Sequence, residues 1–377
     1  KKKYSKLNNF KKYLIKSTDT AYVMFTSGST GEPKAAMISH GNLISFINWS
    51  MSNYDFNQNE KILNLNAIYF DNSVFDIYSS FFSGSCLIPI LIEDVSNHKR
   101  LSHLIWENKC TSWFSVPSLI IYLNKFNFFN DKKSLKSIKR IIFGGEGMPL
   151  SKLSKIYFLY KDKIKFYNVY GPTECTCICS SYQINDDDFN LKSKLPPIGS
   201  LNINFDYILL NKKNKKCRLN ETGEIYLSGP CVGKGYLNNS IETIQKFKTI
   251  DNDLYYKTGD LMRYDNNLNK LFFVGRADNQ IKHMGYRIEL DEIELTLTSL
   301  KYINEAIVIH DTSNNLSKLF CAVSTLKNNI KENEIINFLK KKLPSYMIPH
   351  KFLFFENLPK NRNGKIDRKK IKLKIKI

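Results

Sequence analysis

The chain reads TAYVMFTSGSTGEPKAAMISHGNL at residues 20–43, and the expected fold is built outward from this stretch. Its first part, residues 20–26, is rich in β-branched and aromatic side chains, which predicts a strand. Apolar residues with helical spacing then predict a helix over 39–54, for which Ser39 is a suitable N-cap. A strand that leads through a loop into a helix is the repeating unit of α/β layering.

The same alternation continues along the first half of the chain, where further strands are predicted at 61–68, 86–91, 140–145, 165–171 and 182–184. Beyond about residue 190 the pattern becomes β-rich, with two hairpin-like groups at 205–229 and 254–276.

The C-terminal quarter has a different pattern of apolar and charged residues, and the change near residues 275–278 suggests a domain boundary. After it we predict a charged helix, two strands and a second helix, at 288–300, 305–310, 318–325 and 331–347. We therefore expect two domains, residues 1–275 and residues 276–377.

Charge alone does not select a partner. The 377 residues carry 56 Lys and Arg against 35 Asp and Glu, a net charge of +21, which would attract nucleic acid or anionic lipid. The alternative is that lysine, asparagine and isoleucine are abundant everywhere, as AT-rich coding would produce. We favour this alternative, because the basic residues do not gather into a block with a nucleic-acid motif; a nucleic-acid partner is not expected.

Composition and segment lengths also limit the cell compartment. With 42% hydrophobic residues the chain can bury substantial cores, but no apolar stretch is long enough to cross a bilayer. We expect a cytoplasmic protein without a membrane partner. Cys175, Cys177 and Cys179 alternate as on one face of a strand, and no CxxC pair completes a zinc set. The first residue is Lys, so we expect a fragment or a processed chain.

The loop FTSGSTGEPKA, residues 25–35, follows a strand and combines glycines, three hydroxyl residues and Lys34. Glycine lets backbone N–H groups face an anion, and hydroxyl and ammonium groups add donors, which is how proteins cradle phosphate. The spacing is not that of a Walker motif, since no GK[ST] closes it. A flexible Ser/Gly/Thr turn is the alternative.

Three later segments add chemistry. In NVYGPTEC, residues 168–175, Tyr170 can stack on a base and Glu174 can hold Mg²⁺. Asp260 in YKTGDL suits two ribose hydroxyls, and the segment 274–294 brings Arg276, Asp278, Lys282 and Gly285 to the presumed domain junction. Each segment alone could be an ordinary turn.

Taken in order, these segments resemble the core motifs of the adenylate-forming superfamily, and within it the amino-acid adenylation domains of nonribosomal peptide synthetases and the D-alanine carrier-protein ligases. The matching stretches are FTSGSTGEPKAAMISHGNL, FDNSVFDIY, NVYGPTE, GEIYLSGPCVGKGYL, YYKTGDL, VGRADNQIKHMGYRIELDEIE and LPKNRNGKIDR. The resemblance implies an α/β fold with a large multi-subdomain AMP-binding domain and a small, mobile α+β C-terminal domain. In the family the loop lies deep inside the large domain, so we expect its N-terminal region to be incomplete here.

The family joins a carboxylate to the α-phosphate of ATP and then passes the acyl group to a phosphopantetheine thiol. The resemblance therefore implies ATP and Mg²⁺ as cofactors, an amino acid as substrate and a carrier protein acting in trans. Attack on the α-phosphate needs little acid–base catalysis, because a carboxylate is already nucleophilic. The enzyme therefore has mainly to position the two reactants and to stabilise charge on the transferring phosphoryl group. The implied nucleotide-binding residues are Thr26, Ser27, Gly28, Thr30, Lys34, Asn168, Val169, Tyr170, Gly171, Pro172, Thr173, Asp260, Phe273, Arg276 and Lys365, with Glu174 as the metal ligand.

By the same resemblance, Lys365 in NRNGKIDR is the catalytic lysine that bridges the acyl carboxylate and the phosphate, and Asp278 is the hinge of the mobile domain. Asp71 in FDNSVFDIY would receive the substrate ammonium, since a buried carboxylate needs a cationic partner. A structural capping role is the alternative for Asp71. The other implied pocket residues are Asn72, Phe75, Phe114, Ile142, Gly144, Val169, Cys177, Ile178 and Lys365.

This largely apolar pocket suggests a small or medium uncharged side chain, as in a D-alanine-ligase-like enzyme. The functional alternatives are an acyl- or aryl-CoA ligase of the same superfamily and an inactive, truncated remnant that binds nucleotide or polyanion.

Overall fold

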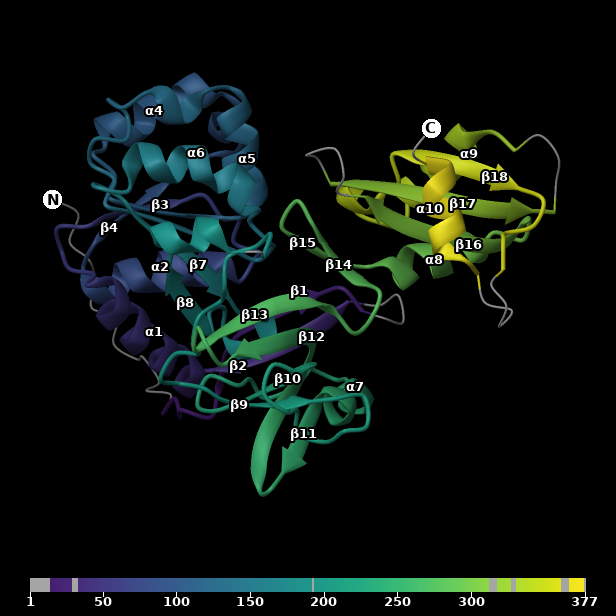
Figure 1. Cartoon of the computed structure of the whole chain (residues 1–377), viewed down its shortest axis with the longest axis horizontal. Helices are drawn as coiled ribbons and strands as arrows, with labels where there is room; N and C mark the ends of the chain where they lie inside the picture. Colours follow the sequence, from purple (N-terminus) through teal and green to yellow (C-terminus); the bar gives the residue numbers. More distant parts are fainter. Residues whose placement is uncertain are drawn as a thin grey trace, which may run out of the picture.

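The computed structural model describes residues 14–28, 33–191, 193–311, 317–326, 330–360 and 366–375. A large N-terminal part contains several sheets, and a smaller C-terminal part lies beside it, with the hairpin β14–β15 between them (Figure 1).

The large part is organised around a six-stranded sheet in the order β4-β3-β5-β6-β7-β8. The strands are parallel except for β8, which is antiparallel to β7. Their bounds are β3 Lys61–Asn64, β4 Cys86–Pro89, β5 Ser112–Ser115, β6 Arg140–Gly144, β7 Lys165–Tyr170 and β8 Ser180–Gln183.

Helices cover both faces of this sheet, because its strands are apolar on both sides. Neighbouring residues of one strand enter different cores: Trp113 packs with the core that contains α4, α5 and α6, and Phe114 packs with the core that contains α1 and α2. The helices and 3-10 turns are α1 His40–Tyr54, α2 Asn72–Ser83, α3 Ile92–Ser96, α4 His98–Glu107, α5 Pro117–Lys125, α6 Leu150–Tyr160, η1 Phe128–Asn130, η2 Thr173–Cys175 and η3 Asp186–Asn190.

The predicted start of α1 is confirmed. Ser39 Oγ accepts the backbone N–H of Asn42 at 3.2 Å, and Asn42 Oδ1 accepts the backbone N–H of Ser39 at 2.9 Å. This reciprocal capping box satisfies two of the otherwise unpaired donors at the helix start.

The β-rich region predicted after residue 190 forms a five-stranded antiparallel sheet, in which β13 also pairs with β12. The hairpin β1–β2 attaches beside it, since Met37 N donates to Gly235 O at 2.9 Å. The bounds are β1 Thr20–Thr26, β2 Lys34–Ser39, β9 Asp206–Leu210, β10 Thr222–Ser228, β11 Phe247–Ile250, β12 Asp253–Asp265, β13 Lys270–Arg276 and α7 Ser240–Lys246.

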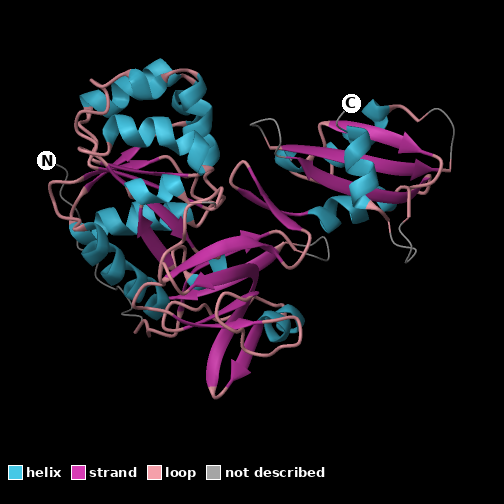
Figure 2. Ribbon diagram, in the orientation of Figure 1, coloured by secondary structure: helices cyan, strands magenta, loops and turns pink. Residues whose placement is uncertain are grey.

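The C-terminal part packs α8 and α9 on one face of the sheet β16-β17-β18 and α10 on the other (Figure 2). Val308 and Ile309, adjacent on β16, point into these two separate cores. The bounds are β14 Gln280–His283, β15 Tyr286–Glu289, α8 Leu290–Thr298, β16 Ile303–Asp311, β17 Lys318–Thr325, α9 Glu332–Lys340, η4 Ser345–Met347, β18 Lys351–Phe355 and α10 Arg368–Ile375.

Apolar residues up to Phe273 pack in the large part, and those from Ile281 onward pack in the C-terminal part. The boundary between residues 275 and 276 remains a prediction.

Two sequence-based expectations were wrong. Cys175, Cys177 and Cys179 are buried together but do not lie on a strand, because Thr176 and Cys177 adopt positive φ angles of 56° and 73°. The helix predicted over 331–347 ends at Lys340, since the chain approaches Pro344, which restricts the residue before it.

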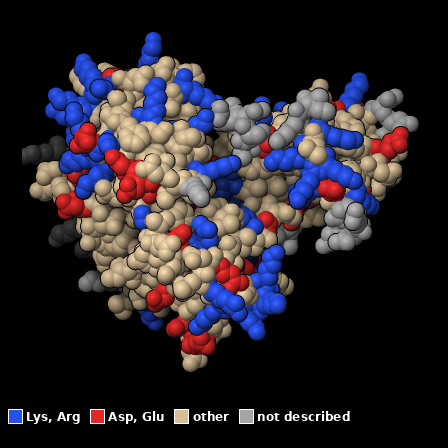
Figure 3. All heavy atoms as spheres, in the orientation of Figure 1, with Lys and Arg blue, Asp and Glu red and all other residues tan. Residues whose placement is uncertain are grey.

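Lys and Arg side chains are spread over both parts of the visible face, with acidic ones between them (Figure 3). Within the described ranges, the model contains no helix whose length and apolar character would let it span a bilayer.

Candidate active site

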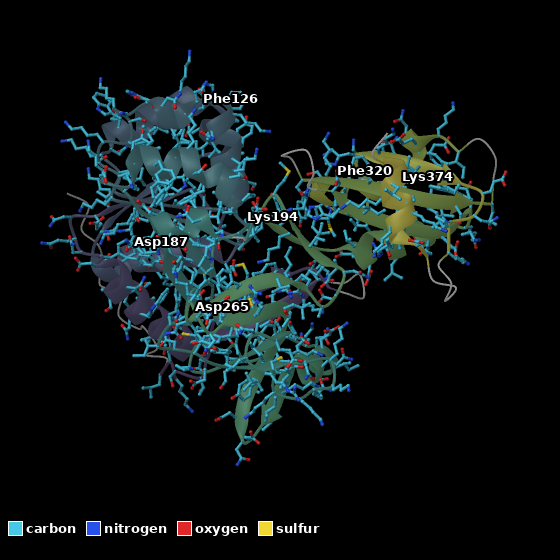
Figure 4. The ribbon with its side chains drawn as sticks, viewed as in Figure 1. Phe126, Asp187, Lys194, Asp265, Phe320 and Lys374 are labelled. Atoms are coloured by element: carbon cyan, nitrogen blue, oxygen red, sulfur yellow. The ribbon has the colours of Figure 1, made fainter. Side chains whose placement is uncertain are left out.

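The candidate site lies at the carboxyl ends of the parallel strands, where ligands bind in open α/β sheets. Here the segment after β7, the start of α2 and the hairpin β14–β15 meet, and side chains fill the region around this hairpin (Figure 4). Gly285, at the tip of the hairpin with φ +84°, approaches Val116 so closely that a Cβ would lie 2.8 Å from it. The C-terminal part therefore reaches into the site.

The hydroxyls of Thr26 and Ser27, at the end of β1, are buried and have no hydrogen-bond partner among the described residues. A buried hydroxyl without a partner costs about 1–3 kcal/mol, so this arrangement is suited to a ligand that supplies acceptor oxygens. Gly28 ends the described part of the loop, and Thr30 lies outside the described residues.

Lys34, at the start of β2, is 5% exposed and its Nζ lies 2.8 Å from Glu242 Oε2 on α7. The ammonium also lies 5.8 Å from the ring centroid of Tyr236. The Glu242 carboxylate therefore holds the Lys34 ammonium at the end of the loop. A phosphate that binds Lys34 would either displace this carboxylate or share the ammonium with it.

Tyr170, Asp260 and Arg276 form a chain of charge-assisted contacts. The Tyr170 hydroxyl donates to Asp260 Oδ2 at 2.7 Å, and Arg276 Nη1 donates to Asp260 Oδ1 at 2.7 Å. Burial, followed by the charge of Asp260, raises the pKa of the Tyr170 hydroxyl, which keeps it a donor. The structure thus brings together three residues that were predicted separately.

The remaining residues predicted at β7 have supporting positions. Asn168 Nδ2 donates to Pro197 O at 2.9 Å, and Val169 pairs with Gly144, where a Cβ would lie 2.4 Å from a Val169 methyl carbon. Gly171 passes so close to Cys177 that a Cβ would lie 2.1 Å from its carbonyl oxygen. Pro172 precedes η2, and Phe273 on β13 packs against the core of the large part.

Asp71 lies directly before α2 and accepts the Thr173 hydroxyl at 2.6 Å through Oδ2. Its side chain makes no cap hydrogen bond to α2, so the predicted alternative of a capping role is not what the geometry shows. Burial raises the pKa of Asp71, while the Thr173 hydrogen bond and the charge of Lys282 oppose that rise. A cation brought close to Asp71 would favour its ionised form.

The predicted pocket walls are brought together in one core. The Phe75 and Phe114 rings lie 5.2 Å apart at 78°, and the Cys177 thiol lies 4.0 Å from Asn72 Oδ1. The wall residues in this core are Phe75, Phe114, Ile142, Val169, Cys177 and Ile178.

Glu174 is fully buried, and both of its oxygens are engaged. Arg287 Nη1 on β15 donates to Oε2 at 2.9 Å and to Oε1 at 3.1 Å, and the Tyr236 hydroxyl donates to Oε1 at 2.7 Å. Burial alone would raise the pKa of Glu174, but Arg287 and the Tyr236 hydrogen bond lower it to about 2. In this arrangement the carboxylate does not fit a metal ion, and the described residues contain no cluster of three or more potential metal ligands.

Sequence reasoning missed Arg287, Tyr236, Glu242 and Lys246. Burial and the positive charges of Arg287 and Lys34 lower the pKa of Lys246, which shows that the cations crowd together here. Lys282 on β14 is half-buried; desolvation lowers its pKa, and the nearby carboxylates of Asp260 and Asp71 oppose that change. The GYRIE motif contains Arg287, but nothing local to that motif indicates Glu174 as its partner.

The predicted hinge residue, Asp278, accepts Arg276 Nη2 at 2.6 Å and Arg276 Nε at 2.9 Å. Lys365 lies outside the described residues. On either side of it, Lys360 pairs with Glu305 at 3.0 Å and Arg368 pairs with Glu294 at 2.9 Å, both within the C-terminal part.

A largely parallel sheet covered on both faces, with the candidate site at the carboxyl ends of its strands, is the arrangement in which open α/β proteins bind nucleotides and other ligands. A model of the AMP-binding enzyme family matches residues 1–237, and a model of the AMP-binding enzyme C-terminal domain matches residues 292–365. The chain therefore belongs to the AMP-binding enzyme family, which confirms the resemblance drawn from its motifs.

Among curated proteins, the chain is similar to a D-alanine–D-alanyl carrier protein ligase of Bacillus licheniformis, with 34% identity over 95% of this chain and 72% of the relative. It is also 36% identical to bacitracin synthase 1 of Bacillus licheniformis, over 94% of this chain but only 7% of that protein.

Among solved structures, the Vibrio cholerae adenylation domain AlmE in complex with glycyl-adenosine-5'-phosphate has a TM-score of 0.85 and 26% identity, covering 97% of this chain and 68% of that one. PA1221, a protein with adenylation and PCP domains, has a TM-score of 0.81 and 25% identity, over 95% and 60%. The expected α/β fold class, with a large N-terminal and a small C-terminal domain, is confirmed.

Proposed function

We propose that this chain activates the carboxylate of a small amino acid with ATP, forming an aminoacyl-AMP and pyrophosphate, and then transfers the aminoacyl group to the phosphopantetheine thiol of a carrier protein acting in trans. The observation that carries this proposal is the contact between Asp71 and Thr173. It joins the site for an ammonium group directly to the segment that would hold the phosphate.

Asp71 is the group that distinguishes amino acids from other carboxylic acids. It is partly buried, it accepts the neutral Thr173 hydroxyl, and it directly precedes α2, whose Phe75 packs in the apolar core. A substrate ammonium would supply the opposite charge that such a carboxylate requires. Relatives whose names include D-alanine and glycyl-adenosine-5'-phosphate support this assignment.

The walls of the pocket favour a small side chain. Phe75 and Phe114 are 0% and 1% exposed and pack edge to face, so there is little room beyond them without repacking. No charged residue occurs among the predicted wall positions. We therefore infer an uncharged side chain of the size of glycine or alanine.

For the nucleotide, Asp260 and Arg276 would bind the ribose, and Thr26, Ser27, Thr30 and Lys34 would bind the phosphates. Tyr170 would cover the adenine while its hydroxyl fixes Asp260. These groups would act by holding the α-phosphate in line with the substrate carboxylate and by stabilising charge on the transferring group.

Lys365 would join the reacting groups during adenylate formation, after a rotation about Asp278. In the structure the hairpin β14–β15 lies at the site, an arrangement suited to the second half-reaction, in which the thiol attacks the acyl carbon. All eight cysteines are free, which agrees with a reducing compartment such as the cytoplasm.

ATP–pyrophosphate exchange tests the proposal. D-alanine, L-alanine and glycine should stimulate exchange, whereas fatty and aryl acids should not. Stimulation by fatty or aryl acids alone would instead assign a CoA ligase, and absence of exchange with every acid would assign an inactive remnant.

A further inference from the structure

Three histidines from separate segments of the C-terminal part lie together next to the turn of the hairpin β14–β15. His283 ends β14, His310 lies on β16, and His350 directly precedes β18. The ring centroid of His283 is 6.0 Å from that of His310 and 6.1 Å from that of His350. His283 is almost completely buried, with 2% of its surface exposed. These three residues and Ser317, which precedes β17, are called the histidine cluster below.

One hydroxyl group links two of the rings. Ser317 Oγ lies 2.5 Å from His283 Nδ1 and 2.5 Å from His310 Nε2. A hydroxyl has a single proton, so it donates to only one of these nitrogens and accepts an N–H from the other. While both rings are neutral, they must therefore have opposite roles toward Ser317, one as acceptor and one as donor.

A proton added to the accepting ring breaks this arrangement. The ring nitrogen becomes a second N–H donor directed at Ser317 Oγ, and the serine proton loses its acceptor. His350 is constrained in a similar way, because its Nδ1 accepts the backbone N–H of Leu319 at 3.3 Å. Two positive rings 6.0 Å apart also repel, which makes a second proton on the cluster about a hundredfold harder to add than the first.

The surroundings of the cluster favour neutral rings. Burial, followed by the charges of His310 and His350, lowers the pKa of His283 from its usual 6.5 to about 4. Burial also lowers the pKa of His310; Lys372 on α10 adds to this effect, and Asp311 opposes it. The Lys372 ammonium lies 3.8 Å from Asp311 Oδ1, so these two charges partly cancel. Acidification therefore places charge on rings that the fold keeps neutral.

The cluster is directly connected to the part of the hairpin that enters the site. His283 is paired across the hairpin with Tyr286, whose ring centroid lies 4.8 Å from that of Phe70 in the large part. Gly285, in the turn between these two paired residues, approaches Val116. The position of the turn in the site therefore depends on where the cluster holds His283.

We propose that His283 is a positioning residue: the neutral histidine cluster holds the hairpin β14–β15 in the site, and protonation of the cluster at mildly acidic pH releases the hairpin. The release itself requires no substrate. Its consequence rests on the proposed function, because the docked hairpin serves the transfer half-reaction, which acid should therefore slow.

Thermodynamic linkage gives the direction and the size of the effect. A histidine whose pKa is lowered by docking supports docking fully above about pH 6.5, and this support is lost as the pH falls from 6.5 toward 4. The docking equilibrium should therefore weaken by about thirtyfold between pH 7.5 and pH 5.0.

Amide hydrogen exchange measures the release in the full chain without nucleotide, amino acid or carrier. After correction for intrinsic exchange rates, the protection of residues 280–289 should fall by about thirtyfold from pH 7.5 to pH 5.0. The protection of β9 and β10 in the large part should stay the same, which provides an internal control. Equal protection of the hairpin at both pH values would overturn the proposal.

Two variants assign the effect to the cluster. His283→Asn keeps a hydrogen-bonding group near the position of Nδ1 but cannot be charged, so the protection of its hairpin should not depend on pH. His103→Gln removes an exposed histidine on α4 and should show the same fall as the natural chain. A fall of the same size in His283→Asn would contradict the role of His283.

NMR of the natural chain with nitrogen-15 in its histidine rings tests the same point without a substitution in the cluster. At pH 5 an ordinary histidine is almost fully protonated, whereas at least one of the six rings should still be neutral. Protonation of all six rings with midpoints near pH 6.5 would overturn the proposal.

Single-turnover transfer of alanine from alanyl-adenylate to free pantetheine connects the release with function. The rate of His283→Asn divided by the rate of the natural chain should be about tenfold higher at pH 5.5 than at pH 7.5. Because the two chains are compared at the same pH, the ionisation of the attacking thiol cancels. If the hairpin is released by acid but no transfer occurs at either pH, the proposed function is wrong and the histidine cluster keeps its role. If transfer occurs and the hairpin stays protected at pH 5.0, only the role of the cluster is wrong.

Discussion

The substitution Asp71→Asn tests how the site recognises an amino acid. Asparagine keeps an oxygen to accept the Thr173 hydroxyl, now 2.6 Å from Asp71 Oδ2, so the pocket should keep its shape. The change removes the negative charge that would face the substrate ammonium. Breaking one side of a buried ion pair costs about 3–5 kcal/mol, because the other charge is left uncompensated.

This cost should appear as a fall of roughly 10²- to 10⁴-fold in kcat/KM for the amino acid in ATP–pyrophosphate exchange. The KM for ATP should change by less than about threefold, since Asp71 does not contact the nucleotide in the proposed mode. Asp187→Asn is the matched control, because Asp187 is an exposed carboxylate on the large part (Figure 4).

A second substrate sharpens the test. Propionate has the size of alanine but no ammonium, so Asp71→Asn should narrow the preference for alanine over propionate. Retention of alanine-dependent exchange within about threefold of the natural chain would show that Asp71 does not bind the substrate ammonium.

Further outcomes follow from other residues. Lys365→Ala should lower amino-acid-dependent exchange by about 10²- to 10³-fold, while transfer from a supplied adenylate to the carrier stays comparatively intact; equal loss of both half-reactions would exclude the assignment. Asp278→Pro should preserve exchange but prevent carrier loading, as measured by mass spectrometry of the carrier, and unimpaired loading would exclude the hinge role. Asp76 is fully buried, which raises its pKa to about 8, so its contribution to stability is fully present below the unfolded pKa and declines as pH rises toward 8. Asp76→Asn should remove that decline, of up to about 1.4 kcal/mol per pH unit, and parallel melting-temperature profiles from pH 5 to 8 for variant and natural chain would contradict this account.

Local patterns predicted much of the fold. Ser39 was predicted as the N-cap of α1, and the structure confirms this role, with Asn42 at position N3 completing the capping box. The strand Lys318–Thr325 was predicted with its observed bounds. Its apolar residues pack into two separate cores, one on each face of the sheet.

Features that depend on distant segments could not be predicted in this way. Cys177 has a positive φ, and its carbonyl oxygen lies so close to Gly171 that a Cβ there would be 2.1 Å away; the alternation of cysteines in the sequence does not indicate this contact. Glu174 was chosen as a metal ligand from its motif, whereas its observed partner, Arg287, is 113 residues away and reaches it only through the docked hairpin.

Site residues could be predicted where their motifs follow strands of the same sheet. Asp71 and Thr173 were found in separate motifs and meet at 2.6 Å, since both motifs follow strands whose carboxyl ends share one edge of the sheet. Glu242, the partner of Lys34, lies on α7 in a stretch without any chemical signature, so only the three-dimensional arrangement reveals it.

Mass spectrometry of the products formed from ATP, Mg²⁺ and candidate acids tests amino-acid adenylation most directly. We expect an aminoacyl-AMP with D-alanine or another small amino acid, formed together with pyrophosphate. Formation of acyl-AMP only from acids that lack an amino group would contradict it.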